Sequence, residues 1–173
     1  RVFNFGAGPA MLPTSVMEKA RDEFLDFKGL GAGLIEISHR SKEFDAVNDR
    51  TDSLFRELSG LPDNFKILYG HGGAQMQFSA IPMNLIDRNP AHKAAYLETG
   101  NFASLARKEA SRYGNISVAA TSEATNFDRI PEFDPASLDA DTSYVHLTST
   151  NTHFGPRWNK FPDTGSIPLV PDM

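Results

Sequence analysis

The stretch Ala94–Ala120, AAYLETGNFASLARKEASRYGNISVAA, decides the fold that the sequence predicts. Its two ends, 94–98 and 116–120, are short apolar runs typical of buried strands. Between them, residues 102–113 have the apolar spacing of a helix, and Gly114 is placed to end it. A strand, a helix and a second strand in this order predict a βαβ unit with parallel strands.

Strands that alternate with helices continue on both sides of this unit. Further strands are expected at residues 65–69, 144–148 and 169–172. Helices are expected at 15–27, at 42–58, and from Gly73 onward with a kink or a new start at Pro82. The predicted class is α/β, with a mainly parallel sheet and helices on both faces. No internal repeat and no dividing linker is visible.

The helix expected at 15–27 depends on two local patterns. Ser15 followed by Glu18 is a capping box, the usual start of a helix. Four apolar residues share one face before Gly29 stops the helix: Val16, Ala20, Phe24 and Phe27.

Composition excludes several classes of protein. The chain has 173 residues, 40% of them hydrophobic, and a net charge of -5, which disfavours a nucleic-acid surface. No apolar run is long enough to span a bilayer, so no membrane role is expected. No cysteine is present, which excludes disulfides and thiolate sites, and the histidines lack metal-ligand spacing. A cytoplasmic enzyme without a metal fits these observations.

The segment Tyr69–Gln75, YGHGGAQ, is a candidate anion site. Its glycines lead into a helix, and free backbone N–H groups at a helix start suit a phosphate. A purely structural Gly-Gly turn is the commoner case. The segment lacks the Gly-Lys-Ser/Thr of a Walker A loop, and no G-x-S-x-G elbow supports an esterase.

Two further places offer charged groups. His39 and Arg40 stand just ahead of a predicted helix, and arginine suits phosphate or carboxylate recognition. An arginine paired with a nearby acid is an equally good interpretation. Asp172 ends a predicted strand, where ligands of open α/β sheets bind. A solvated strand-end aspartate is the commoner structural alternative.

Together, these segments resemble one family. The order NFGAGPAMLP, SHRSKEF, GGAQMQF, ETGNFA, TSTNTHFG, PDTG and PLVPDM is similar to the phosphoserine aminotransferases. These form a branch of the class V, fold-type I aminotransferases that depend on pyridoxal 5'-phosphate (PLP). The resemblance covers Asn4 to Met173 and implies the N-terminal part of the large PLP-binding domain, residues 14–173, preceded by an arm, residues 1–13, that belongs with the small domain.

The resemblance also implies roles for individual residues. Ala74 and Gln75 match the amides that hold the PLP phosphate, and Thr152 matches a hydroxyl beside the cofactor ring. Asp172 matches the acid that pairs with the pyridinium nitrogen. Phe102 stands where the family usually has a tryptophan stacked on that ring.

The implied reaction transfers an amino group between glutamate and 3-phosphohydroxypyruvate, giving phosphoserine and 2-oxoglutarate. His39 and Arg40 match contacts to the substrate phosphate at a neighbouring subunit's site, so a homodimer is expected. Gln75 replaces an arginine of some members, and Thr150 replaces a common asparagine.

The family's Schiff-base lysine lies beyond Asp172, and none of the seven lysines of this chain matches it. No catalytic residue is therefore expected here, and the chain is expected to be an inactive fragment of a longer enzyme. The alternatives are another class V enzyme, such as an alanine–glyoxylate aminotransferase, and a non-catalytic fragment or binding module.

Overall fold

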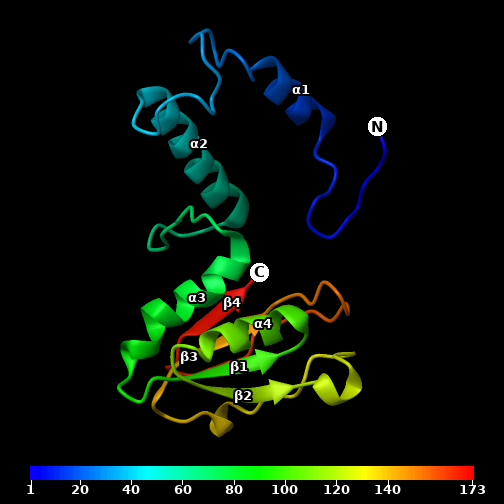
Figure 1. The fold of residues 1–173 in the computed structure, drawn as a ribbon, viewed down its shortest axis with the longest axis vertical. Coiled ribbons are helices and arrows are strands. Elements are labelled where there is room, and N and C mark those ends of the chain that lie inside the picture. Colours follow the sequence, from blue (N-terminus) through cyan, green and yellow to red (C-terminus); the bar gives the residue numbers. More distant parts are fainter. The chain divides into compact units, whose positions relative to one another are not determined.

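The computed structural model describes all 173 residues, which form two compact units (Figure 1). Unit 1 is Arg1–Tyr69 and unit 2 is Gly70–Met173. Unit 1 contains two helices joined by irregular loops, and unit 2 contains the sheet. No helix in either unit has the length and apolar character needed to cross a membrane.

In unit 1, helix α1 runs over Thr14–Asp22 and is shorter than expected. The predicted capping box is wrong, because Pro13 takes the N-cap position and no side chain caps the helix. Phe24 and Phe27 lie in turns beyond its end. The backbone N–H of Phe27 donates to the carbonyl of Ala32 at 2.9 Å, so this part of the chain closes a loop instead of extending the helix.

Helix α2, Lys42–Ser59, confirms the expected position and is capped at both ends. The Ser41 hydroxyl accepts a hydrogen bond from the N–H of Phe44 at 3.2 Å. Gly60 follows the last turn with φ of 62°, a left-handed conformation that glycine adopts without strain. Local sequence alone therefore sets both limits of this helix.

Residues 65–69 were expected to form a strand, and that prediction is wrong. None of the four strands of the protein pairs with this segment. A strand needs a neighbour to take its backbone hydrogen bonds, and without one an apolar run stays irregular. Leu68 and Tyr69 are accordingly exposed.

Unit 2 is built on a four-stranded parallel sheet with the order β2-β1-β3-β4 (Figure 1). All four strands were predicted within two residues of their observed limits. They are β1 Lys93–Glu98, β2 Asn115–Thr121, β3 Thr142–Thr148 and β4 Leu169–Asp172. The α/β class with a parallel sheet is confirmed.

Two helices, α3 Gly73–Leu85 and α4 Asn101–Ala110, pack on one face of this sheet. α4 ends three residues before its expected limit. Pro82 lies inside α3 without restarting it, and a 3₁₀ turn, Ile86–Arg88, follows. The buried cluster beneath the helices is Phe78, Ile86, Ala94, Tyr96, Ala106, Ala110 and Tyr144.

Loops cover the opposite face of the sheet. Its buried side chains are Ala95, Leu97, Ala120, Val145 and Leu147. Residues of irregular segments pack on them, among them Phe133, Leu138, Trp158 and Ile167. The expectation of helices on both faces is therefore met on one face only.

Candidate functional site

The candidate site begins at the carboxyl ends of the strands. Because the strands are parallel, these ends meet at one edge of the sheet, where open α/β sheets bind ligands. β3 and β4 end in register, with Thr148 opposite Asp172. The N–H of Ser149 then donates to the carbonyl of Asp172 at 2.8 Å, which fixes the two ends together.

Asp172 lies at this edge without a cationic partner. Burial raises the pKa of its carboxyl group, and the nearby Thr148 hydroxyl acts in the opposite direction. The Thr148 oxygen is itself buried and makes no hydrogen bond of normal geometry. A half-buried carboxylate beside an unpaired hydroxyl favours a ligand group that brings a proton or a positive charge.

Asn151 joins the ends of β1 and β3, and the sequence did not reveal this role. Its buried side-chain amide donates to the carbonyl of Thr99, which follows β1. A side chain at Gly100 would collide with this amide. Asn151 stands in the TSTNTHFG segment, but nothing in that segment marks it as a link between strands.

Helix α3 points its first turn toward the same edge. The ring of Phe78, in its second turn, lies edge-on to His146 in β3 with centroids 6.4 Å apart. Near its end, the carbonyl of Ile86 accepts a hydrogen bond from Ser143, close to the start of β3, at 2.7 Å. α3 therefore runs antiparallel to β3, and its N-terminus lies toward the strands' carboxyl ends.

The first turn of α3 has the features expected of an anion site. Gly72 takes the N-cap position with φ of 89°, and no side chain caps the helix. A Cβ at Gly72 would collide with the Met76 side chain, so the turn requires glycine. Ala74 and Gln75 follow in the exposed first turn, where backbone N–H groups lack helical partners.

Phe102 lies in the first turn of α4, immediately after the end of β1, with 38% of its surface exposed. It lines a narrow crevice together with Thr148 and Asn151. Thr152 is the exposed residue after Asn151. Four of the expected cofactor residues thus belong to elements that meet at one edge: Ala74, Gln75, Phe102 and Asp172.

His146 is a second residue whose environment the sequence did not reveal. It is fully buried on β3, stacked on Tyr96 with centroids 4.7 Å apart, and neither ring nitrogen has a partner. Burial lowers its pKa from 6.5 to about 4, so the ring is neutral near pH 7. Period-two alternation places it two residues before Thr148, on the same face of the strand.

His39 and Arg40 lie in unit 1, in an exposed turn ahead of α2. The backbone N–H of Arg40 donates to the Ser38 hydroxyl at 3.1 Å, and that of Ser41 donates to the Ser38 carbonyl at 3.0 Å. No acid pairs with the Arg40 side chain, so its guanidinium is free for a ligand. Its binding role remains a prediction.

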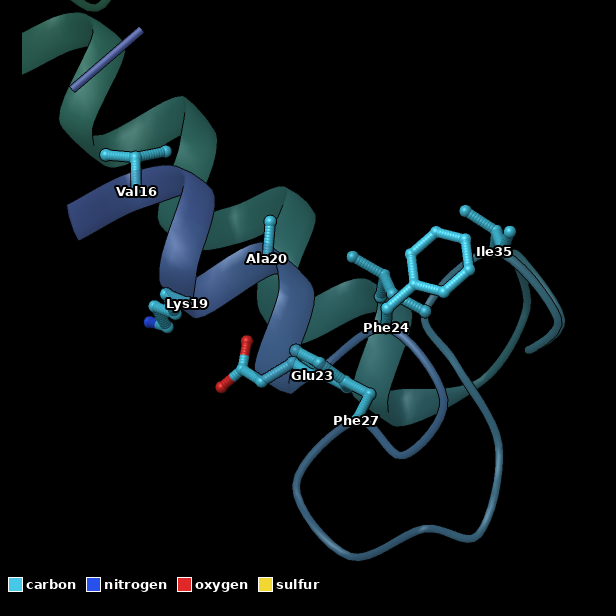
Figure 2. A pocket seen from close by; sticks show the side chains of 8 residues that line it. Val16, Lys19, Ala20, Glu23, Phe24, Phe27 and Ile35 are labelled. Carbon is cyan, nitrogen blue, oxygen red and sulfur yellow. The ribbon is translucent and has the colours of Figure 1, made fainter. Parts of the chain in front are cut away.

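Unit 1 also contains a cavity of about 330 Å³ (Figure 2). Figure 2 shows Val16 and Ala20 on α1, with Phe24 beside Ile35 from the loop that follows. Lys19 and Glu23 are its only charged lining residues. An apolar lining with two charges at exposed positions offers no arrangement of polar groups for catalysis.

The edge of unit 2 fits the cofactor that the resemblance implies. The uncapped first turn of α3 suits a phosphate, and the exposed ring of Phe102 suits stacking on a heterocycle. Asp172 suits a protonated ring nitrogen, because its carboxylate has no cation of its own. These three groups therefore match the phosphate, the ring face and the ring nitrogen of PLP.

Comparison with known proteins identifies the family of the chain. Residues 2–167 match the family described as aminotransferase class-V. The chain is 46% identical over 173 residues to the phosphoserine aminotransferase of Bacillus subtilis, covering 100% of this chain and 47% of that one. It is 43% identical over 172 residues to that of Herpetosiphon aurantiacus, covering 99% and 47%.

Solved structures agree in fold. The phosphoserine aminotransferase from Bacillus circulans subsp. alkalophilus superimposes with a TM-score of 0.92 at 42% identity, covering 100% of this chain and 47% of that one. The PLP-bound enzyme from Trichomonas vaginalis gives 0.88 at 31% identity, covering 99% and 47%. The chain spans about half the length of the curated relatives it matches, in agreement with the expectation of a partial chain. Since the family match extends over nearly all of its residues, this chain belongs to the class-V aminotransferases.

Proposed function

We propose that the full-length protein containing this chain is a phosphoserine aminotransferase with PLP as its cofactor. It exchanges an amino group between glutamate and 3-phosphohydroxypyruvate, giving phosphoserine and 2-oxoglutarate. The names of its relatives support this reaction. The single structural observation that supports it best is the half-buried Asp172 carboxylate, without a cation, at the edge toward which α3 points its uncapped first turn.

Five residues would hold the cofactor in this proposal. The backbone amides of Ala74 and Gln75 bind its phosphate, since free N–H groups at a helix start favour an anion. The Phe102 ring stacks on one face of the heterocycle. The Thr152 hydroxyl lies beside the ring oxygen, and Asp172 binds the ring nitrogen. When bound, PLP supplies an electron sink for the substrate Cα.

Asp172 has the most demanding role, because its carboxylate keeps a proton on the ring nitrogen. Partial burial strengthens that ion pair relative to one in water. The register with Thr148 and the link through Asn151 hold the three strand ends in place. Such rigid support keeps a polar group aligned through a reaction.

His39 and Arg40 would bind the substrate phosphate, in a homodimer where they reach the neighbouring subunit's site. Arg40 suits this role, because a free guanidinium forms charge-assisted hydrogen bonds with phosphate oxygens. We retain the assignment of residues 1–13 to the small domain and of residues 14–173 to the large domain. We also propose that the protein acts in the cytoplasm, and the net charge of -5 disfavours binding to nucleic acid.

The 173-residue chain alone would not transaminate in this proposal, because none of its lysines matches the family's Schiff-base lysine. In unit 2, Lys93 forms ion pairs with Asp139 and Asp141 at 3.0 and 3.1 Å, at the strands' amino ends. The lysine that binds PLP covalently would have to come from the half of the family's sequence that this chain does not match. The seven lysines of the chain are Lys19, Lys28, Lys42, Lys66, Lys93, Lys108 and Lys160.

Steady-state kinetics of the full-length protein test the proposal. Asp172→Asn should lower kcat/KM for phosphoserine with 2-oxoglutarate by roughly 100- to 1,000-fold, the scale of removing one preorganised electrostatic group. The matched control is Asp139→Asn, at the opposite edge of the sheet, which should retain wild-type activity. Normal turnover in Asp172→Asn would remove this residue from the site. Preference for alanine and glyoxylate over phosphoserine would instead indicate another class V activity.

A further inference from the structure

The ring of Phe102 has a partner that its expected role does not explain. The imidazole of His153 stacks on it, with centroids 5.2 Å apart and planes inclined by 23° (both are exposed residues). The side-chain nitrogen of Asn101 lies 3.0 Å from Nδ1 of His153. The imidazole is therefore held in two ways, by a ring on one side and an amide at its edge.

Two hollows share Phe102, and they have different linings. The crevice is lined by Thr148 and Asn151, which belong to the strand edge with Asp172. A second hollow, a cavity of about 430 Å³, is lined by His153 and Lys108 but by neither of those residues. His153 therefore takes no part in the narrow crevice that Phe102 shares with Thr148.

We propose that His153 is a positioning residue, which supports the Phe102 ring from behind so that its other face is ready to stack on the cofactor. The inference rests on the proposed function, since it takes PLP as the ligand of this edge. It requires no contact between His153 and the cofactor. The imidazole acts only by fixing the orientation of the phenyl ring.

The physical reason is preorganisation. Phe102 is a small aromatic ring near a helix start, and 38% of its surface is exposed, so few core contacts restrict its rotamers. A stacked imidazole restricts them, and the Asn101 amide restricts the imidazole in turn. Order that exists before binding lowers the entropy lost on binding, which raises affinity.

The test uses the full-length protein and PLP itself as the probe. His153→Ala removes the supporting ring, whereas His153→Phe retains a ring and loses only the contact with Asn101. The control is His92→Asn, since His92 is another exposed histidine of unit 2 and its φ of 50° is tolerated by asparagine. Three quantities are measured: the Kd for PLP, the circular dichroism induced in the bound cofactor, and the Tm without cofactor.

We expect His153→Ala to raise the Kd by about 2- to 12-fold, the range that aromatic pairs span. The induced dichroism per bound PLP should fall, because a loosely held ring orients the cofactor less well. His153→Phe should restore both values, and His92→Asn should match wild type. The Tm should be equal in wild type and both His153 variants, since the stack is at the surface; His92→Asn also loses the contact of His92 with Asp87 at 2.7 Å and is compared only for PLP binding.

Each other outcome contradicts the inference in its own way. A wild-type Kd and dichroism in His153→Ala would show that the stack has no effect on the cofactor. Tighter binding by that variant would show that His153 covers the face that PLP needs. A lower Tm with unchanged dichroism would make the residue structural. If the wild-type protein shows no induced dichroism with PLP, the proposed function itself fails, and the inference with it.

Discussion

Units 1 and 2 are folded from the same chain by different means. In unit 2, strands and helices bury a core on both faces of a sheet, and residues such as Leu97 and Val145 are fully inaccessible. In unit 1, neither α1 nor α2 contains a buried residue, and Phe27 is the only buried apolar side chain. Its helices therefore depend on local sequence, while the elements of unit 2 depend on one another.

Because of this difference, residues at the strand ends of unit 2 are held more rigidly than residues in the turns of unit 1. The strand ends of unit 2 are tied by register and by the Asn151 side chain, so Asp172 has a fixed place. The turn with His39 and Arg40 is held within unit 1 by two hydrogen bonds from backbone N–H groups to Ser38, one to its hydroxyl and one to its carbonyl. Chemistry that needs fixed geometry is expected in unit 2, and recognition by long charged side chains suits unit 1.

The largest expected effect concerns the core of unit 2. Burial lowers the pKa of His146 from 6.5 to about 4, so the unfolded state takes up a proton first as the pH falls. Stability is therefore complete above pH 6.5 and is lost as the pH falls toward 4, by about 3 kcal/mol. Hydrogen exchange in β3 of the full-length protein measures this as a falling free energy of opening.

His146→Phe keeps the stack on Tyr96 and removes the titrating group. As the pH falls from 6.5 toward 4, the opening free energy of wild type should therefore decrease relative to that of His146→Phe. His71→Asn is the control, because His71 is an exposed histidine of unit 2 whose side chain forms no hydrogen bond or ion pair, so the variant should leave the wild-type curve unchanged. Parallel curves for wild type and His146→Phe would show that this histidine is not the group that titrates.

A smaller effect is expected from the charged turn of unit 1. Arg40→Ala in the full-length enzyme should lower kcat/KM for phosphoserine about ten- to hundredfold more than for glutamate. A charge-assisted hydrogen bond contributes roughly 1.5–3 kcal/mol, and only the first substrate has a phosphate. Arg50→Ala, an exposed arginine of α2, is the control. Equal losses for both substrates would assign Arg40 a structural role.

The smallest effect concerns the local caps of unit 1. Ser41→Ala removes the hydroxyl that accepts from the N–H of Phe44 and should destabilise α2 by about 1 kcal/mol. Hydrogen exchange in the first turn of α2 is the measurement. Ser53→Ala is the matched control, since its hydroxyl bonds only to the Asp49 carbonyl within the helix. A helix that tolerates Ser41→Ala without loss would need contacts outside its own sequence.

The elements that the sequence predicted well are those with strong local signals or a partner in the same unit. Strands β1 to β4 are apolar runs that pair with each other, and α2 has a cap at each end. The failures have the opposite character. Residues 65–69 have a strand-like composition without a neighbouring strand, and Ser15 has a capping pattern that Pro13 displaces. Composition cannot reveal whether a partner is present.

For the site, sequence patterns and resemblance identified side chains but not their supports. Asp172 and the turn at Gly72 could be predicted, because a strand end and a Gly-Gly helix start are visible in one dimension. The link from Asn151 to Thr99 and the stack of His153 on Phe102 join residues about fifty positions apart. Such contacts depend on how α4 and the loop after β3 are placed, which only the folded chain shows.

The central claim is that Asp172 keeps the ring nitrogen of bound PLP protonated at the strand edge of unit 2. The most direct test is the ¹⁵N chemical shift of that nitrogen, measured with ¹⁵N-labelled PLP bound to the full-length protein near pH 7.5. We expect the shift of a protonated pyridine in wild type and that of an unprotonated one in Asp172→Asn. An unprotonated nitrogen in wild type, or a protonated one in both proteins, would contradict the account.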